Sequence, residues 1–274
     1  MKKVVALALF GDGDRYAQYL RSFVLAHLNL FPIRDDWRLR IHVDAAMCKS
    51  PLLSWLGPLT NFVETHVLKE PPILTKAMLW RMAPAFDPEV DYVFPRDLDA
   101  CPMPRDLRAC QEFIRSEATV HTVHDAPVHV GVMGGLCGFR TAALRGVTGW
   151  KCLDHLYHFA NQTVSAWAQH GTDQIVLNRM LERYPSMTLL EHRYHGWHAG
   201  PGAHPPREAS IYPCQAWSTP LADEGPADLD GLRTPADRLA NHLGAAGYDH
   251  EAAWRFWMER GDPILAAHFR ACPK

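Results

Sequence analysis

Short apolar runs that end in polar or glycine-rich turns alternate with helix-spaced segments through most of this 274-residue chain. The run at residues 4–10 stops at Gly11, and the run at residues 92–94 stops just before a cluster of charges. Continuous apolar runs of this length are typical of strands buried on both faces. Because such strands alternate with helices, we predict an α/β fold with a mostly parallel central sheet flanked by helices, in which residues 4–10 and 91–94 form neighbouring parallel strands.

The same patterns place the remaining elements. We predict further strands at residues 38–43, 61–67 and 119–123, and helices at residues 74–82, 104–114 and 172–183. Proline, glycine and acidic residues are frequent from residue 201 to residue 233, and Thr234 and Pro235 are then typical of a helix start. We therefore predict one α/β domain over residues 1–215, and a loop and helical C-terminal extension over residues 216–274 that packs on it.

Composition narrows the class of protein. The chain is 47% hydrophobic, which suffices for one sizeable core, and its net charge of -2 does not favour a nucleic-acid-binding surface. The seven cysteines are odd in number and form no C-x-x-C pair, so we expect reduced thiols and a cytoplasmic protein. No apolar stretch is long enough to span a bilayer, and we interpret the apolar run after Lys2 and Lys3 as a buried strand instead of a signal peptide.

Two carboxylates, Asp97 and Asp99, follow the predicted strand at residues 92–94. In open α/β sheets ligands bind outside the carboxyl ends of the strands. Two carboxylates this close repel each other unless a cation lies beside them, and oxygen ligands suit Mg²⁺ or Mn²⁺. The pair therefore predicts a divalent metal site that also holds substrate phosphates. An ordinary acidic turn is the alternative, because D-x-D triplets are common by chance.

Several short motifs resemble, in order, a group of bacterial and viral glycosyltransferase-like proteins of the GT-A type, which have a glycogenin-like core. The matching segments are AMLWRM at residues 77–82, DPEVD at 87–91, RDLD at 96–99, DAPVH at 125–129, GGLCGFR at 134–140 and GTDQIVL at 171–177. The chain departs from the pattern at Ala100, where the group has serine, and at Cys137, where it has tryptophan. The resemblance implies a GT-A fold and transfer of a sugar from a UDP- or GDP-sugar to a hydroxyl acceptor.

The resemblance also implies a donor site. It assigns contacts with the nucleotide base to the loop after the first strand, and contacts with the donor phosphates or sugar to later motifs. The residues implied for donor binding are Leu9, Phe10, Gly11, Arg81, Arg96, Asp97, Gly134, Gly135 and Gln174. Each has a structural alternative, such as core packing for Phe10, a salt bridge for Arg81 and a tight turn for the two glycines.

Metal ligation and acid–base chemistry complete the implied site. Asp97 and Asp99 would hold Mn²⁺ or Mg²⁺, and a histidine near the end of the core, His195 or His198, would complete the coordination. Asp173 would hydrogen-bond the acceptor hydroxyl or remove its proton, with helix capping as the alternative. His129 is a weaker candidate for a sugar contact.

Other functions remain open from the sequence. A nucleotidyltransferase also brings a nucleotide and a metal to carboxylates, the histidine-rich segment at residues 191–200 would suit a metal-dependent hydrolase, and a non-catalytic sugar-nucleotide-binding module would bind a donor without turnover. The acceptor can be a glycan, a lipid-linked sugar, a small molecule or a modified DNA base.

Overall fold

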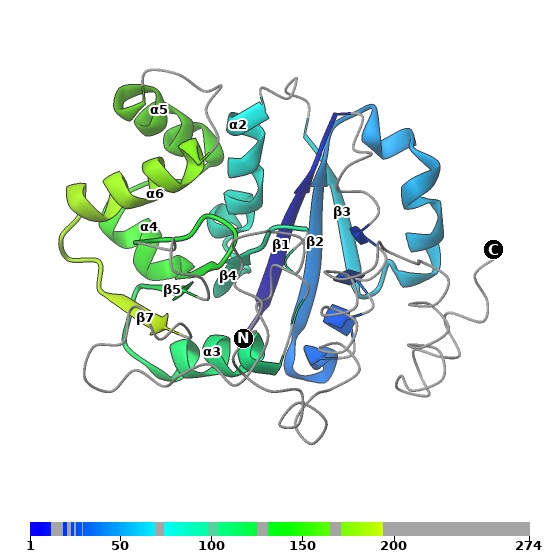
Figure 1. Ribbon diagram of the computed structural model, residues 1–274, viewed down its shortest axis with the longest axis horizontal. Coiled ribbons are helices and arrows are strands. Elements are labelled where there is room, and N and C mark those ends of the chain that lie inside the picture. Colours follow the sequence, from blue (N-terminus) through cyan, green and yellow to red (C-terminus); the bar gives the residue numbers. More distant parts are fainter. Residues whose placement is uncertain are drawn as a thin grey trace, which may run out of the picture.

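The computed structural model describes residues 1–11, 19, 20, 23, 24, 26–28, 30–68, 74–98, 100, 102, 104–124, 131–164 and 171–193. Over these residues the protein is a mixed α/β structure with one seven-stranded sheet (Figure 1). The α/β class predicted from the sequence is confirmed. The predicted C-terminal extension, and the boundary at residue 215, lie outside the described residues.

The strand order in the sheet is β3-β2-β1-β4-β6-β5-β7. The strands are β1 (Lys3–Leu9), β2 (Trp37–Val43), β3 (Val63–Val67), β4 (Tyr92–Pro95), β5 (Val120–His124), β6 (Cys137–Arg140) and β7 (Leu189–Arg193). Strand β1 pairs in parallel with β2 on one side and β4 on the other, as predicted for the runs at residues 4–10 and 91–94. Only β6 among these strands runs antiparallel to its neighbours, so the other six point their carboxyl ends toward one edge.

Helices cover both faces of this sheet. The described α-helices are α2 (Leu74–Ala77), α3 (Pro104–Arg115), α4 (Thr141–Thr148), α5 (Leu153–Thr163) and α6 (Thr172–Arg183), and the 3₁₀ segments are η1 (Ile33–Asp35), η2 (Met47–Lys49), η3 (Pro51–Leu59) and η4 (Met78–Phe86). The helix predicted at residues 74–82 is thus one α-helical turn that continues as 3₁₀ helix. Pro84, which has no N–H to donate, lies near the end of η4.

The alternation of side chains along β1 divides the core into two clusters. Val5, Leu7 and Leu9 pack with α3, η3 and the described apolar residues between 19 and 31 on one face. Val4 and Ala6 pack with η4, α4, α5 and α6 on the other. Because β1 is buried on both faces, its sequence is continuously apolar, which is the reason that the strand is recognisable from the sequence.

Among the described strands and α-helices, four were not predicted: β6, α4, α5 and β7. The last of these overlaps the start of the histidine-rich segment, residues 191–200, that the sequence analysis treated as a source of ligands. No helix among the described residues has the length and hydrophobicity that a membrane crossing requires.

Candidate active site at the carboxyl edge of the sheet

Asp97 lies where strand β4 ends, as the sequence predicts. Arg96 still makes an antiparallel bridge to Leu136, next to β6, and Asp97 follows it with its backbone N–H directed at the carbonyl of Gly135 at 3.4 Å. Because β4 is parallel to β1, Asp97 shares the carboxyl edge of the sheet with Leu9 and the residues that follow it.

Arg81, Asp97 and Asp173 form an ion-pair network at this edge. Arg81 comes from η4, Asp97 from the end of β4, and Asp173 from the first turn of α6. The Nη1 of Arg81 donates to Oδ1 of Asp97, and its Nη2 donates to Oδ2 of Asp173 at 2.5 Å. The fold therefore joins three of the motifs quoted above through one guanidinium.

Burial and charge act in opposite directions on this guanidinium. Arg81 is only 3% exposed. Burial by itself disfavours its charged form, but attraction to Asp97 and Asp173 outweighs burial, and the pKa of Arg81 is raised above its usual value. Arg81 is therefore a permanent positive charge, placed beneath the surface of the site.

Gly134 and Gly135 lie in close contact with the two carboxylates of the network, those of Asp173 and Asp97. A Cβ atom on Gly135 would overlap the carboxylate of Asp97, and one on Gly134 would overlap Asp173 and lie within 3.0 Å of Nη2 of Arg81. Neither glycine has a positive φ angle. The close approach of side chains thus accounts for both glycines, whereas their predicted contact with a sugar stays a prediction.

Arg96 is held inside the protein by a second ion pair. Its guanidinium donates to both carboxylate oxygens of Asp106, at 3.2 and 2.6 Å, and to the carbonyl of Cys137 at 2.6 Å. Burial opposes its charge, but the attraction of Asp106 is stronger, and the pKa of Arg96 is raised. The donor contact predicted for Arg96 is not part of this arrangement, in which the side chain ties β4 to α3 and β6.

The loop after β1 is fixed by two neighbours. The ring of Phe10 meets the buried ring of Trp80 edge-on, with centroids 5.6 Å apart. The N–H of Gly11, which has a φ of 75°, donates to Oδ2 of Asp44 at 2.8 Å. Asp44 also accepts the N–H of Met47 at 2.6 Å and is 5% exposed.

Sequence reasoning did not name Asp44 as a site residue. Its signal in the sequence was its position, because Asp44 follows β2 directly, at the same edge of the sheet as Asp97. Leu9, predicted with Phe10 and Gly11 to contact the base, has a buried side chain. Its predicted contact would therefore use the backbone.

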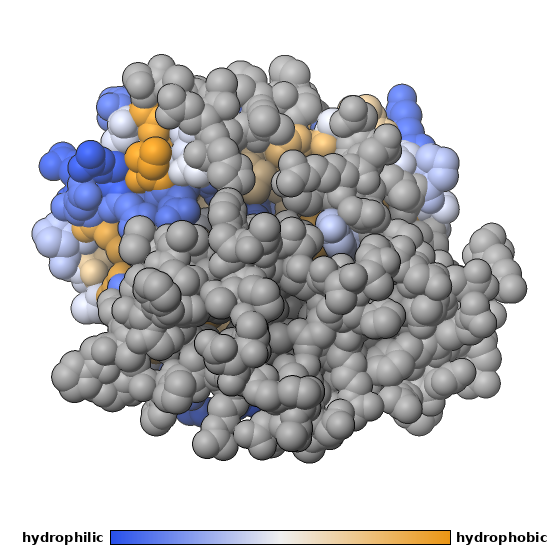
Figure 2. All heavy atoms as spheres, viewed as in Figure 1, coloured by the Kyte–Doolittle hydropathy of each residue, from blue (hydrophilic) through white to orange (hydrophobic). Residues whose placement is uncertain are grey.

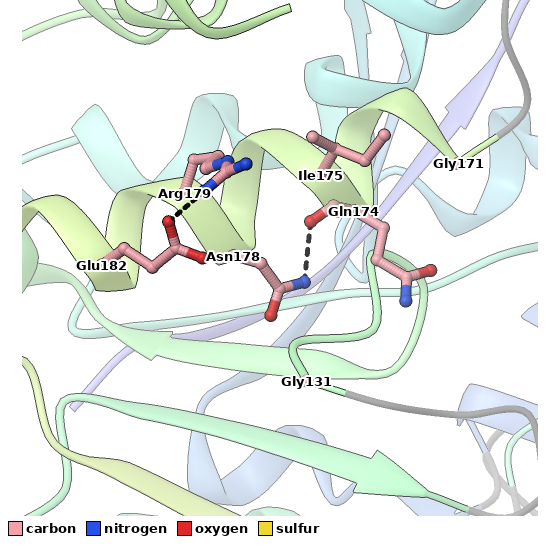
Figure 3. Close-up of a pocket in the computed structure, with 7 residues that line it drawn as sticks. All are labelled: Gly131, Gly171, Gln174, Ile175, Asn178, Arg179 and Glu182. Atoms are coloured by element: carbon pink, nitrogen blue, oxygen red, sulfur yellow. Dashed lines mark hydrogen bonds and ion pairs between the residues drawn. The ribbon is translucent and has the colours of Figure 1, made fainter.

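The outer side of α6 lines a shallow pocket of about 270 Å³ beside the turn at Gly131. Figure 3 shows Gln174, Asn178, Arg179 and Glu182 along this side of the helix. Asn178 holds the turn by accepting the N–H of Val132 at 2.9 Å and donating to its carbonyl at 3.0 Å. Gln174 directs its Nε2 at the sulfur of Met133, 3.4 Å away.

Only one of the predicted metal ligands, Asp97, is among the described residues. Asp99, His195 and His198 lie outside them, as does His129. No group of three or more His, Cys, Asp or Glu side chains in the described part of the chain is arranged to hold a metal ion. The carboxylate of Asp97 has the donor chemistry that Mg²⁺ and Mn²⁺ prefer, and a quarter of its side chain is exposed, so it fits such an ion as one ligand.

His192, within the histidine-rich segment, has a structural position in β7. Its Nε2 lies 3.1 Å from Oε2 of Glu112 in α3, and its Nδ1 lies 3.4 Å from Nδ1 of the buried His121. Burial is the main cause that lowers the pKa of His192, against the opposing effect of Glu112. This histidine therefore joins β7 to β5 and α3, away from the network around Arg81.

Comparison with known proteins gives similarity to solved structures alone. No protein-family model and no curated protein matches the chain. One similar structure is a protein from Desulfovibrio desulfuricans G20 named as a nucleotide-diphospho-sugar transferase, with 19% identity over 70% of this chain and 80% of that chain and a TM-score of 0.45. Another is the apo form of the glycosyltransferase GlyE from Streptococcus pneumoniae TIGR4, with 16% identity over 70% of this chain and a TM-score of 0.47. The chain spans less than half of GlyE, 45% of its length. A third is TarS from S. aureus in complex with UDP, with 12% identity over 70% of this chain and 60% of that chain and a TM-score of 0.44.

Proposed function

We propose that this protein is a metal-dependent glycosyltransferase of the GT-A type, which transfers a sugar from a UDP- or GDP-sugar to a hydroxyl acceptor. One observation carries the proposal. Motif residues far apart in the sequence, such as Arg81 and Asp173 at a separation of 92 positions, meet at the carboxyl edge of a mostly parallel sheet. That edge is where α/β sheets bind their ligands.

In this proposal the residues at the carboxyl edge of the sheet have separate roles in binding the nucleotide and the metal. The loop at Phe10 and Gly11 holds the nucleotide base, and Asp44 fixes that loop through the N–H of Gly11. Asp97, together with Asp99, holds Mn²⁺ or Mg²⁺ beside the diphosphate, with His195 or His198 as a further ligand. A cation held by these residues would supply positive charge to the diphosphate leaving group.

The buried charges around Asp97 prepare this site before any ligand arrives. Arg81 offsets part of the repulsion between neighbouring carboxylates, and its own burial keeps it from moving with the ligand. A preorganised arrangement of charges costs little reorganisation when charge develops on the leaving group. We propose that Gln174, on the exposed side of α6, contributes hydrogen bonds to sugar hydroxyls.

A thermal-shift panel tests the proposal. The wild-type protein is heated with UDP-glucose, UDP-galactose, GDP-mannose, UDP and GDP, each with and without Mn²⁺. We expect at least one nucleotide to raise Tm in the presence of Mn²⁺ and to do so far less without it, because a ligand that binds only the folded state stabilises it by mass action. If no nucleotide diphosphate or sugar nucleotide shifts Tm at millimolar concentration, the proposal is wrong.

Product analysis separates the two enzyme classes. A glycosyltransferase incubated with its donor releases a nucleoside diphosphate, by transfer or by slow hydrolysis. A nucleotidyltransferase incubated with a nucleoside triphosphate and a sugar phosphate releases pyrophosphate. Detection of pyrophosphate, with no release of nucleoside diphosphate from any donor, would favour the second class.

A further inference from the structure

We propose that Asp173 is a positioning residue that acts on Asp97 through the buried guanidinium of Arg81, and that it is not the general base expected from the sequence. The inference rests on the proposed function to the extent that Asp97 belongs to the donor and metal site. The contacts, the exposures and the charges of the three residues each support it.

The contacts make Arg81 a bridge. A guanidinium is planar and rigid, so the direction of one N–H bond fixes the direction of the others. Asp173 accepts a hydrogen bond from Nη2 of Arg81, and Asp97 accepts one from Nη1. The bond at Nη2 therefore determines where Nη1 points. A displacement of Asp173 on α6 therefore moves the donor that orients Asp97.

The two carboxylates at the ends of this bridge differ in exposure. The side chain of Arg81 is 4% exposed, that of Asp173 is 9% exposed and that of Asp97 is 25% exposed. A ligand that approaches the edge reaches Asp97 first. A general base has to come within about 3.2 Å of the hydroxyl that it deprotonates. The Oδ2 of Asp173 is instead directed at Arg81, and its carboxylate fills the space beside Gly134.

The charges of the three residues sum to one negative charge. Two carboxylates and one guanidinium leave that charge at a site whose most exposed member is Asp97. Without Asp173 the sum would be zero, and Arg81 would pair with Asp97 alone. A divalent cation at Asp97 would then meet a neutral pair in place of a net negative charge, so the structure assigns Asp173 an effect on cation binding that needs no direct contact.

The first experiment measures the affinity for UDP with Mn²⁺ by calorimetry at pH 7.5. Asp173→Asn is nearly isosteric and removes the charge. We expect it to weaken the binding of UDP with Mn²⁺ by roughly tenfold or more, the size of a moderate charge interaction. An Asp173 that served as general base, or that contacted only the acceptor, would leave this affinity unchanged. Binding equal to that of the wild type would therefore overturn the inference.

A double-mutant cycle shows whether the effect passes through Arg81. In an Arg81→Gln background, the further change Asp173→Asn should cost little or no additional affinity for UDP with Mn²⁺, because the bridge is already broken. Additive losses would mean that Asp173 contacts the ligand directly, and the inference would be wrong. Asn178→Ala is the matched control, because Asn178 also lies on α6 but bonds the neighbouring turn at Val132 and the carbonyl of Gln174, outside the pairs that Arg81 makes with the two carboxylates. It should change the affinity by less than about threefold, within the usual range for a site outside the network.

Arg81→Lys keeps the test decisive if Asp173→Asn does not fold. Lysine retains the positive charge but lacks the planar fork that joins two carboxylates. We expect Arg81→Lys to lose affinity for UDP with Mn²⁺ to a similar extent as the asparagine variant. Wild-type affinity in Arg81→Lys would show that charge alone suffices and would overturn the bridging role.

Urea unfolding tests the bridge without any ligand. The double variant Asp97→Asn with Asp173→Asn leaves Arg81 buried without either carboxylate. It should raise the equilibrium constant for unfolding by a factor that is roughly fivefold or more above the product of the factors for the two single variants. In an Arg81→Met background the factors for the two single variants should simply multiply.

If the wild type binds no nucleotide while this coupling is found, the proposed function fails and the bridge stands. If the wild type binds UDP with Mn²⁺ and the coupling is missing, the bridge fails and the proposed function stands.

Discussion

Gly135 and Asp97 lie so close together that a methyl group on Gly135 would overlap the Asp97 carboxylate. The two residues flank different strands, because Asp97 follows β4 and Gly135 precedes β6. The backbone N–H of Asp97 is directed at the Gly135 carbonyl, so the same pair of residues also joins the two strands. The position of the carboxylate that we propose as a metal ligand therefore depends on the missing side chain of Gly135.

Gly135→Ala should displace the carboxylate of Asp97. The added Cβ meets a carboxylate that Arg81 already holds, so the strain cannot be relieved by a simple rotation of the side chain. We expect a loss of stability of about 1–3 kcal/mol, typical of overpacking, and a weaker calorimetric affinity for UDP with Mn²⁺.

Gly146→Ala is the control for that substitution. Gly146 lies in α4 with nothing near the position of a Cβ atom, so alanine should leave nucleotide affinity unchanged and raise stability by up to about 1 kcal/mol. A Gly135→Ala protein that matches the wild type in both stability and affinity would contradict the close approach described here.

Asp44→Ala should loosen the loop that follows β1. The carboxylate accepts the N–H groups of Gly11 and Met47, and both would lose a charged partner. We expect stability to fall by about 1–3 kcal/mol in urea unfolding and the affinity for UDP to fall as well.

Asp91→Ala provides the matched control. Asp91 also accepts a backbone N–H, that of Lys2 at 2.7 Å, but it precedes β4 and therefore lies at the opposite edge of the sheet. It should leave the UDP affinity unchanged. Equal affinities in the Asp44 and Asp91 variants would mean that the loop after β1 does not hold the nucleotide.

Removal of the metal should stop turnover. We expect EDTA to abolish release of the nucleoside diphosphate from the donor, and added Mn²⁺ or Mg²⁺ to restore it. Asp99→Ala should abolish this turnover and Asp97→Ala should reduce it severely, because loss of the positive charge at the leaving group costs several kcal/mol, or roughly a thousandfold in rate. Full activity in EDTA, or near-wild-type turnover by Asp99→Ala, would exclude the metal mechanism.

Acid should destabilise the protein partly through His27. Burial, with a smaller effect from Arg96, lowers the pKa of His27 from 6.5 to about 3, and its Nδ1 has no hydrogen-bond partner in the described structure. The folded state therefore keeps this histidine neutral, whereas the unfolded state takes up a proton below pH 6.5. The unfolded state binds more protons in this range, so stability is lost as the pH falls from about 6.5 toward 3.

His27→Leu should flatten this dependence. Between pH 7.5 and pH 5.0, the wild type should lose about 2 kcal/mol more free energy of unfolding than His27→Leu, since one proton contributes about 1.4 kcal/mol per pH unit below the unfolded pKa. Urea unfolding at both pH values measures the difference. His155→Gln, at an exposed position in α5, should keep the wild-type dependence. If His27→Leu loses as much stability in acid as the wild type, the neutral buried state of His27 is refuted.

The sequence by itself determined the elements whose patterns are local. A strand buried on both faces is continuously apolar, and so β1 and β4 could be predicted, together with their parallel pairing and the edge at which Asp97 lies. Helix α6 was predicted with its bounds, Thr172–Arg183, because a glycine, a polar first turn and regular apolar spacing occur together. Strands β6 and β7 escaped prediction because they overlap the glycine-rich motif at residues 134–140 and the histidine-rich segment at residues 191–200, which were both interpreted as sites of ligand contact.

Only the tertiary structure decided which charged side chains pair with one another. Arg81 and Arg96 look alike in the sequence, each within a motif, yet one joins Asp97 to Asp173 and the other is bound to Asp106 inside the core. The sequence named Asp173 as a site residue but could not show that its partner is a buried guanidinium. Such pairings depend on which side chains meet after the chain has folded, over separations of up to 92 residues, and no local periodicity records them.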